Sequence, residues 1–398
     1  MRTHLFNNCL SSMRWSLIAL LAVGASMAQA QVQGITDTEI VIGAVLDLSG
    51  PLAIAGGPQR DGMIFATEEI NNAGGIHGRK IRLILEDSGY DTKKGILITQ
   101  KLLSQDKVFA LVNTFGSAIV QATQPVAIEH GIPFLFPSAA SNITYLPFHP
   151  LKFGLFATSN DHMRVVVDYA YGKLGKRRFG ILYQDDETGQ SALRAAEDQL
   201  KAHGLTLVER TSYKRGDTNF SAQVSRLKAA NADIVVVGHS IREGASVAIE
   251  TKAHGWPVDM MVPWGTVNAV ITLGGPAVEG LYGATQFAVQ PQTTAFKAFN
   301  ERFKARFGHG GIQDYGTYGY TAMMLFAEGA KNAGRNLTPQ SLSQGLEKIK
   351  NFKTTIEGPL ITYGPGNHAS PADAYIMQVR AGRWVQIAGP IAYENMAK

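Results

Sequence analysis

Residues 39–86, which decide the fold of this chain, read EIVIGAVLDLSGPLAIAGGPQRDGMIFATEEINNAGGIHGRKIRLILE. The first eight of them, Glu39–Leu46, form an apolar run that is typical of a buried strand. A helix is expected from about Gln59 to Asn72, because the glycine pair Gly74-Gly75 is a usual helix stop. Lys80–Glu86 then alternates as a half-buried strand does. The stretch therefore predicts a strand, a helix and a second strand in succession.

The same alternation of strand and helix continues along the chain in two runs. In the first run we expect helices at Thr92–Ser104 and Ser117–His130 and strands at Val108–Val112 and Pro133–Phe136. In the second run we expect strands at Arg178–Tyr183, Leu205–Glu209 with its neighbours, Asp233–Val237 and Met260–Val262, and helices at Gly189–Ala202, Ser221–Ala230 and Glu243–Gly255. Alternating elements of this kind build parallel sheets with helices on both faces. Two runs therefore predict an α/β protein with two lobes.

The last third of the chain departs from this pattern. Phenylalanines recur along Phe296–Phe307 at the spacing of one helix face, which we interpret as core packing rather than as a surface for stacking a cofactor. The stretch Phe352–Ile387 has short alternating runs separated by Gly-Pro pairs. It predicts small antiparallel strands instead of another strand–helix unit.

The first thirty residues have the features of a secretory signal peptide. Arg2 and Arg14 provide positive charge, Trp15–Met27 is apolar, and Ala28-Gln29-Ala30 is a small-x-small cleavage site. The apolar run is too short for a membrane span of about 20 residues. We therefore expect residues 1–30 to be removed and the mature protein to be exported to the periplasm.

Charge and cysteine content argue against two other classes of protein. Removing Arg2 and Arg14 leaves 35 basic residues against 32 acidic ones, so the mature net charge is 35 − 32 = +3. The mature chain lacks the clustered basic face expected of a nucleic-acid-binding protein, and no nucleic-acid partner is predicted. The single cysteine, Cys9, lies in the signal peptide, so no lipid-anchor cysteine follows the cleavage site.

Motifs for catalysis are missing from the sequence. No glycine-rich dinucleotide or phosphate loop follows a predicted strand. The segment Gly238–Arg242 approaches a nucleophile elbow but lacks its final glycine. The acidic run Asp185–Glu187 is interpreted as a solvated loop rather than a cation site. We therefore predict no enzyme activity, no cofactor and no metal.

Small polar residues follow two neighbouring predicted strands at their carboxyl ends. Residues 113–117 (NTFGS) follow one strand, and residues 137–141 (PSAAS) follow the next. Ligands of parallel sheets collect beyond these ends. Ser117 and Ser141 either offer hydroxyl and backbone N–H groups to an anion or simply cap the helices that they begin. Composition alone does not separate these two roles.

A resemblance to a known family is carried by the stretch from Leu46 to Asp91. It resembles the opening of the leucine/isoleucine/valine-binding protein family, the soluble receptors of ATP-driven (ABC-type) uptake systems. Further stretches match the family in order: PVAIEHGIPFLFPSAAS (125–141), YQDDETGQ (183–190), DIVVVGH (233–239) and YGTYGYTAM (315–323). Each motif is loose, but the ordered set is specific and covers nearly the whole mature chain.

The resemblance implies a type I periplasmic binding fold with two lobes, each a parallel sheet flanked by helices. The chain is expected to cross between the lobes three times, near Thr158, Phe287 and His368. Lobe 1 would then comprise residues 31–158 and 288–367, and lobe 2 residues 159–287 and 368–398. A ligand enters the open cleft and the lobes hinge shut on it. The expected protein is a monomer that delivers a small-molecule carboxylate to a membrane permease, with a sensory receptor of the same fold as the alternative.

The resemblance also implies a set of site residues. Ser117 falls on the serine that binds the ligand carboxylate. Ser138 and Ala139 fall on a loop whose backbone meets the ligand, and Ala140 stands where a hydroxyl is common, so that Ser141 is its candidate replacement. Thr188 and His239 fall on positions of ligand-covering aromatics. The full set of expected ligand-binding residues is Phe115, Ser117, Ser138, Ala139, Ala140, Ser141, Thr188, His239, Trp264 and Tyr318.

Trp264 is the largest departure from the family pattern, because it occupies the position of the glutamate that holds the ligand ammonium. Burying an ammonium without a counter-charge costs several kcal/mol, on the order of four powers of ten in affinity. Either another acid among Asp186, Glu187 and Asp314 binds the ammonium, or the ligand has none. We expect a carboxylated ligand with a bulky apolar or aromatic body, walled by Phe115, Trp264 and Tyr318, with a branched-chain amino acid as the alternative.

Overall fold

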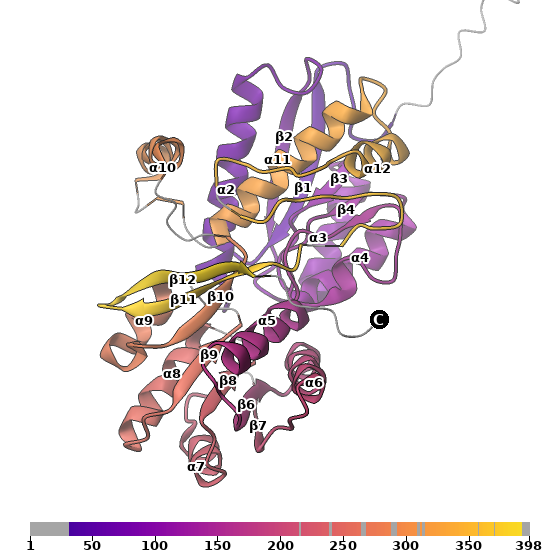
Figure 1. Ribbon diagram of the computed structural model, residues 1–398. Helices are drawn as coiled ribbons and strands as arrows, with labels where there is room; N and C mark the ends of the chain where they lie inside the picture. The colour runs from indigo at the N-terminus through magenta and orange to yellow at the C-terminus, as the bar shows by residue number, and fades with distance from the viewer. Residues whose placement is uncertain are drawn as a thin grey trace, which may run out of the picture.

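The computed structural model describes residues 32–214, 216–238, 241–263, 268–287, 293–308, 311–312, 315–356, 358–369 and 371–391. The predicted signal peptide, residues 1–30, lies outside this described part of the chain. Two separate sheets organise the molecule into an upper and a lower lobe (Figure 1). The predicted two-lobed α/β architecture is therefore confirmed.

The first lobe is built on a five-stranded sheet in the order β2-β1-β3-β4-β5, with every neighbouring pair parallel. Helices from both halves of the chain cover this sheet (Figure 1). Its strands are β1 (Glu39–Leu46), β2 (Lys80–Asp87), β3 (Ala110–Val112), β4 (Phe134–Leu135) and β5 (Lys152–Phe153). Its helices are α2 (Ala53–Asn72), α3 (Thr92–Ser104), α4 (Ser117–Glu129), the 3-10 turn η1 (Asn142–Thr144), α10 (Thr294–Phe307), α11 (Tyr315–Ala333) and α12 (Pro339–Glu347).

The second lobe is built on a seven-stranded sheet in the order β12-β11-β10-β9-β8-β6-β7. Strands β6 to β10 run parallel to one another, and β11 and β12 add an antiparallel edge. The strands are β6 (Phe179–Gln184), β7 (Glu209–Tyr213), β8 (Ile234–Val237), β9 (Asp259–Val262), β10 (Tyr282–Thr285), β11 (Ala374–Arg380) and β12 (Arg383–Ile391). The helices are α5 (Ser159–Gly172), α6 (Glu187–Ala202), α7 (Ser221–Ala229), α8 (Ile241–Ala253), α9 (Asn268–Gly274) and the 3-10 turn η2 (Gly275–Val278).

Two predicted element positions were wrong. Helix α2 begins at Ala53 rather than near Gln59, and Pro58 lies inside its first two turns. Pro58 has no N–H to donate to Ile54 O, so the helix continues through the proline at the cost of one hydrogen bond in its second turn. The strand expected at Leu205–Glu209 instead begins at Glu209, because its partner β6 starts only at Phe179 and pairs Gly180 with Glu209. Val208 N still donates to Phe179 O of β6 at 2.9 Å, whereas Leu205 N donates to Leu200 O in the last turn of α6, so Leu205 belongs to the turn after that helix.

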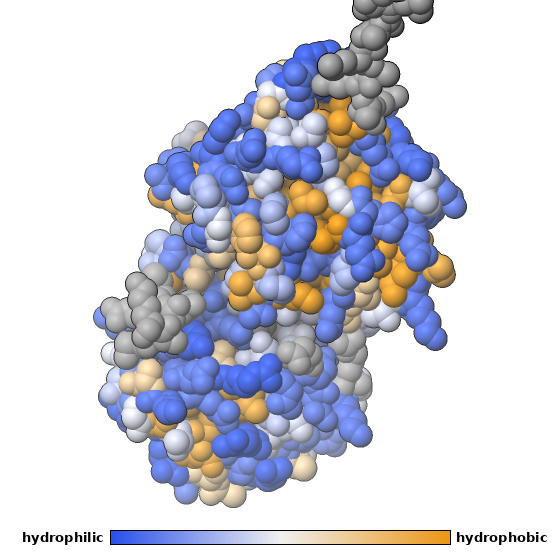
Figure 2. Space-filling view, turned by 90° about the vertical axis from the view of Figure 1, so that its right-hand side faces the viewer, coloured by the Kyte–Doolittle hydropathy of each residue, from blue (hydrophilic) through white to orange (hydrophobic). Residues whose placement is uncertain are grey.

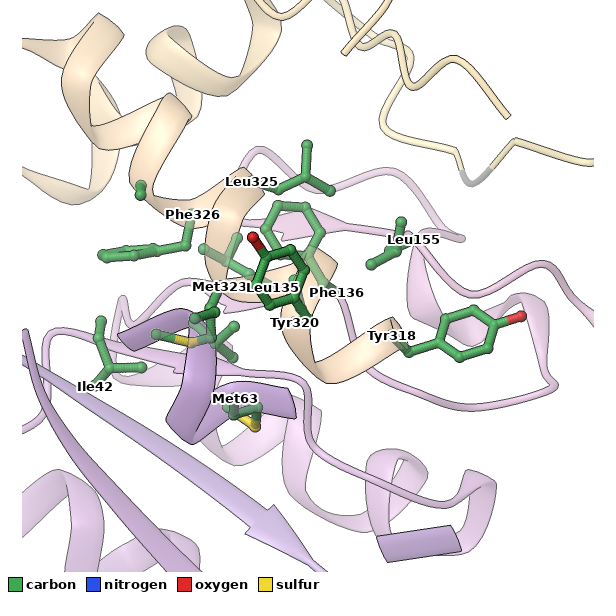
Figure 3. Close-up of a cluster of buried hydrophobic side chains, with 14 of the residues drawn as sticks. Ile42, Met63, Leu135, Phe136, Leu155, Tyr318, Tyr320, Met323, Leu325 and Phe326 are labelled. Atoms are coloured by element: carbon green, nitrogen blue, oxygen red, sulfur yellow. The ribbon is translucent and has the colours of Figure 1, made fainter. Parts of the chain in front are cut away.

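Helices α2 and α11 pack at backbone contact through glycines. A Cβ atom on Gly62 would lie 2.1 Å from the carbonyl oxygen of Gly316, and one on Gly319 would lie 2.2 Å from that of Gln59. The buried side chains around this contact are shown in Figure 3. Because the two helices touch so closely, α2 determines where the first turns of α11 lie.

The phenylalanine face predicted at 296–307 packs into the core of the first lobe. Phe299 and Phe303 of α10 meet Phe65 of α2 edge-on, with ring centroids 5.4 and 5.2 Å apart. Phe307 is only partly buried. Arg306 pairs with Glu68 at 2.8 Å on the rim of the same contact. The interpretation of these phenylalanines as core residues is confirmed.

The chain passes between the two sheets in three places. Residues 154–158 lead from β5 to α5, Gln286 begins the passage from β10 to α10, and the residues around His368 lead into β11. These segments contain the boundaries proposed from the sequence at Thr158, Phe287 and His368. We retain the division into lobes at these residues as a proposal.

Candidate ligand site between the lobes

The carboxyl edges of both parallel sheets face the three crossing segments. Strand β5 runs into residues 154–158 at its carboxyl end, and all strands of the first sheet are parallel to it. Strand β10 likewise runs into Gln286 at its carboxyl end, and β6 to β9 are parallel to it. Each sheet therefore points the edge at which α/β proteins bind ligands toward the other lobe.

The polar loops predicted after β3 and β4 lie side by side at this edge. Phe115 and Ser138 form a parallel bridge, in which Gly116 N donates to Ser138 O at 2.9 Å and Ser138 N donates to Thr114 O at 2.9 Å. The backbone turns sharply at both strand ends, where Asn113 has a φ of 59° and Phe136 a φ of 55°. Positive φ values at residues other than glycine are uncommon and cluster at functional sites.

Helix α4 begins at this edge without a capping side chain. Its N-cap residue is Gly116, with a φ of 95° that favours glycine, and a Cβ atom there would lie 2.3 Å from the ring of Tyr90. The first amide groups of a helix have no acceptor within the helix, and a glycine cap provides none. The amino end of α4 is therefore suited to an anion.

The two serines with alternative roles behave differently. Ser117 is the first residue of α4 rather than its cap, is partly exposed, and its Oγ accepts a hydrogen bond from Ala140 N at 3.2 Å. Ser141 caps the 3-10 turn η1, and its Oγ accepts from Ile143 N at 3.4 Å. The capping role is thus observed for Ser141, whereas the Ser117 hydroxyl joins the loops that follow β3 and β4.

A buried polar network that sequence reasoning missed supports the two loops from behind. Asn113 Nδ2 donates to Gln59 Oε1 at 3.0 Å, and Gln59 Nε2 donates to Ser138 Oγ at 3.2 Å. The Ser138 side chain therefore points into the first lobe, and Ala139 and Ala140 beside it are also buried. Among the described residues, Asn113 Oδ1 and Thr114 Oγ1 are buried without a hydrogen-bond partner. The only sequence signal for this network is a polar residue, Asn113, directly after an apolar run.

Aromatic side chains form a wall beside these loops. Tyr318 lies between Phe156 and Phe287, with ring centroids 4.4 and 4.9 Å away. Tyr315 stands edge-on to Phe115 at 5.9 Å. Figure 3 shows Tyr318 projecting from the first turns of α11, away from the core residues farther along that helix. Two of the expected wall residues, Phe115 and Tyr318, therefore belong to one group of aromatic rings. Phe115 contacts Tyr315, and Tyr318 contacts Phe156 and Phe287 of the crossing segments.

The residues expected at the site from the second lobe follow β6, β8 and β9 in the sequence. Thr188 lies partly exposed in the first turn of α6. Asp186 caps that helix, and its carboxylate accepts from Gly189 N at 3.0 Å and from the Gln184 side chain. His239 and Trp264, each two positions after the end of β8 or β9 in the sequence, lie outside the described residues.

One titratable group is buried close to this edge of the second lobe. His162, in the first turn of α5, is fully buried, and its Nδ1 donates to Pro263 O at 3.0 Å. Burial lowers the pKa of His162 to about 4, although the bond to the Pro263 carbonyl partly opposes this change. His162 is therefore a neutral imidazole at physiological pH.

A serine and a histidine, Ser221 and His254, lie together in the second lobe. Ser221 Oγ lies 2.8 Å from His254 Nε2 at the surface of the second lobe. A carboxylate oxygen of Glu250 approaches the same ring nitrogen at 3.9 Å. A general base needs an orienting partner on its other nitrogen, so this arrangement differs from a hydrolytic triad. No cluster of three metal-ligating side chains occurs in the described part of the chain.

Comparison with known proteins places this geometry in a family. The model of the periplasmic binding protein family matches residues 39–383. The "Leu/Ile/Val-binding protein homolog 1" of Brucella suis is 26% identical over 353 residues, which cover 86% of this chain and 91% of that protein. The chain belongs to the periplasmic binding protein family, whose members are solute-binding proteins rather than enzymes.

Solved structures share the fold at lower sequence identity. The branched-chain amino acid transporter substrate-binding protein LivJ of Streptococcus pneumoniae, in complex with isoleucine, superposes with a TM-score of 0.75 at 23% identity, covering 88% of this chain and 100% of that chain. A fatty acid ABC transporter substrate-binding protein from Thermomonospora curvata gives a TM-score of 0.77 at 22% identity, covering 90% and 93%. The predicted type I periplasmic binding fold is confirmed. Within the described residues, every helix is too short or too polar to cross a membrane.

Proposed function

We propose that this protein is exported to the periplasm, captures a small carboxylated molecule between its lobes as a monomer, and delivers it to the permease of an ABC-type importer. The observation that supports this proposal most directly is the pair of parallel-sheet carboxyl edges that face each other across the crossing segments. A ligand held there touches both lobes at once. Such a ligand stabilises the closed arrangement because it binds that arrangement more tightly than the open one.

The amino end of α4 is the proposed carboxylate site. Its uncapped amides, the partly exposed Ser117 hydroxyl and the Ala140 loop converge at the end of β3 and β4. Amide and hydroxyl donors to a carboxylate form charge-assisted hydrogen bonds, which are stronger than neutral ones. The aromatic wall around Tyr318 lies on the same side of the first lobe and suits an apolar ligand body.

The ligand is proposed to lack an ammonium group. One of the three acids able to replace the missing glutamate, Asp186, already accepts hydrogen bonds as the cap of α6. Trp264, at the usual glutamate position, offers an aromatic face worth about 0.5–2 kcal/mol to a cation, far less than a paired carboxylate. The ligands named for the two structural relatives, isoleucine and a fatty acid, share a carboxylate and an apolar body but not the ammonium.

Thermal-shift measurements with matched ligands test both ends of the proposal. We expect 3-methylpentanoate or 3-phenylpropanoate to raise the melting temperature of the mature protein, with about 2.7 kcal/mol of stabilisation at a ligand concentration of 100 Kd. The corresponding amines, 2-methylbutylamine and phenylethylamine, should give no shift. Stabilisation by isoleucine or phenylalanine but not by their deaminated acids would show that an ammonium is recognised. Stabilisation by the amines would overturn the carboxylate site.

Ser117→Ala should weaken binding of the best acid in this series by about 1–3 kcal/mol, the cost of losing a hydrogen bond to a charged group. The variant also removes the acceptor for Ala140 N, so the loop after β4 loses one support. Isothermal titration calorimetry gives the dissociation constant. Ser104→Ala is the matched control, because that hydroxyl only bonds Gln100 O within α3. Equal dissociation constants for Ser117→Ala and the control would remove Ser117 from the site.

A further inference from the structure

A single glutamine joins all three segments that connect the lobes. Gln286 is 0% exposed and follows β10 in the second crossing. Its Oε1 accepts from Ala157 N at 3.0 Å, and its Nε2 donates to Leu155 O at 2.8 Å, both in the first crossing. The same Nε2 donates to Pro371 O at 3.2 Å in the third crossing. One side chain therefore satisfies backbone groups in two segments that are distant from it in sequence.

These bonds lie outside both sheets. Leu155 and Ala157 fall between β5 and α5, and Pro371 precedes β11, so none of the three is part of a strand ladder. A backbone bond from Gly154 N to His368 O, at 2.9 Å, ties the first and third crossings together at the side of the first lobe. Gln286 adds the second crossing to this pair. Buried backbone groups deprived of a partner are costly, so the three segments are held as one unit.

The same unit touches the aromatic wall of the proposed ligand site. Phe287, the residue after Gln286, meets Tyr318 edge-on at 4.9 Å, and Phe156, between Leu155 and Ala157, meets it at 4.4 Å. Space around Phe287 is tight, because a Cβ atom on Gly358 would lie 2.4 Å from its ring. A displacement of either crossing segment therefore moves a ring that packs against Tyr318.

We propose that Gln286 is a positioning residue that makes the three crossings a single pivot. The lobes then open and close as one rotation, and Tyr318 keeps its position against Phe156 and Phe287. The proposal rests on the proposed capture of a ligand between the lobes. Hinge residues absorb the backbone change of domain closure, and here one buried amide couples the three segments that must change together. Without it, each crossing flexes independently and the ligand-free protein samples a broader range of lobe orientations.

The mature chain has no cysteine, which permits clean spin labelling. Leu97→Cys in α3 and Ile249→Cys in α8 place one label on each lobe at exposed positions. Inter-label distances are then measured by double electron–electron resonance without ligand, in the otherwise unchanged protein and with Gln286→Met added. Methionine preserves the length of the side chain and removes all three hydrogen bonds. Gln199→Met is the matched control, since Gln199 is equally buried but bonds only Asp168 and Arg164 within the second lobe.

Gln286→Met should broaden the distance distribution, whereas Gln199→Met should leave it unchanged. Hydrogen exchange provides a second readout, because the Ala157 amide loses its acceptor and should exchange about tenfold faster. An unchanged distance distribution in Gln286→Met would overturn the proposal. Should that variant fail to fold, exchange in the unsubstituted protein still decides: rapid exchange at Ala157 in the ligand-free state would show that Gln286 does not hold the first crossing. Both measurements are made without ligand. They therefore test the pivot separately from the proposed function, whose failure would appear as an absence of thermal shifts.

Discussion

Gly62→Ala should lower the free energy of unfolding by about 3 kcal/mol or more, the range of severe overpacking in a close-packed core. The added methyl group would lie 2.1 Å from Gly316 O and 2.9 Å from Tyr320 N, both backbone atoms of α11. Backbone cannot rotate out of the way as a flexible side chain can, so α2 and α11 must move apart. Their separation opens gaps among the buried residues shown in Figure 3. Urea denaturation measures the loss.

The control for this prediction lies in the same helix. A Cβ atom on Gly57 would meet nothing within 4 Å, so Gly57→Ala should stabilise the protein slightly, by up to about 1 kcal/mol of helix propensity. Gly62→Ala should also weaken ligand binding, because α11 carries Tyr318. Equal stabilities for the two alanine variants would show that the α2–α11 contact is looser than the distances indicate.

Stability should fall in acid because His162 is buried as a neutral imidazole. Its folded-state pKa of about 4 lies below the ordinary value of 6.5, so the unfolded state binds more protons between these pH values. The free energy of unfolding contributed by this residue is fully present above pH 6.5 and decreases as the pH falls toward 4. With a difference of this size, linkage gives a loss of about 3 kcal/mol between pH 7.5 and pH 4.

His162→Asn isolates this contribution from other acid effects. The asparagine amide retains a donor for Pro263 O but does not titrate, while the lost ring volume lowers stability equally at every pH. Urea denaturation at several pH values should therefore give a stability difference between the two proteins that shrinks as the pH falls. Parallel pH profiles would show that His162 does not titrate in this range. Above pH 7 the stability difference between the two proteins should no longer change with pH, because the imidazole is then neutral in both the folded and the unfolded state.

The sequence predicted the elements whose signals are local. The apolar runs that became β1 and β8 need no distant partner to be recognised, and the glycine pair after Asn72 ends α2 in sequence as in structure. The carboxyl-end loops at Phe115 and Ser138 could also be predicted, because every parallel sheet presents such loops at one edge. The two boundary errors have physical causes. Helix α2 continues through Pro58 and so begins earlier than expected, and the strand expected at Leu205–Glu209 begins where its partner β6 begins.

The residues that support the site could not be found in this way. Asn113 and Gln59 are 54 positions apart, and Gln286 reaches Leu155 across 131 positions. A buried glutamine has the same sequence signature as an exposed one, so only the assembled backbone shows which carbonyl and amide groups it satisfies. The roles of Ser117 and Ser141, which composition left open, were separated by a similar contact, the bond from Ala140 N to Ser117 Oγ.

The sequence by itself determined the class of this protein: an alternating α/β chain in two runs, with polar loops after its strands and a resemblance spread in order over the mature chain. These properties follow from hydrophobic periodicity and turn residues, which act over a few positions. Only the tertiary structure decided that both carboxyl edges face one another, that α4 begins uncapped beside Ala140, and that Gln286 closes the three crossings into one unit. Those features depend on which distant backbone groups meet once water is excluded, and hydrogen-bond satisfaction in the folded interior selects them.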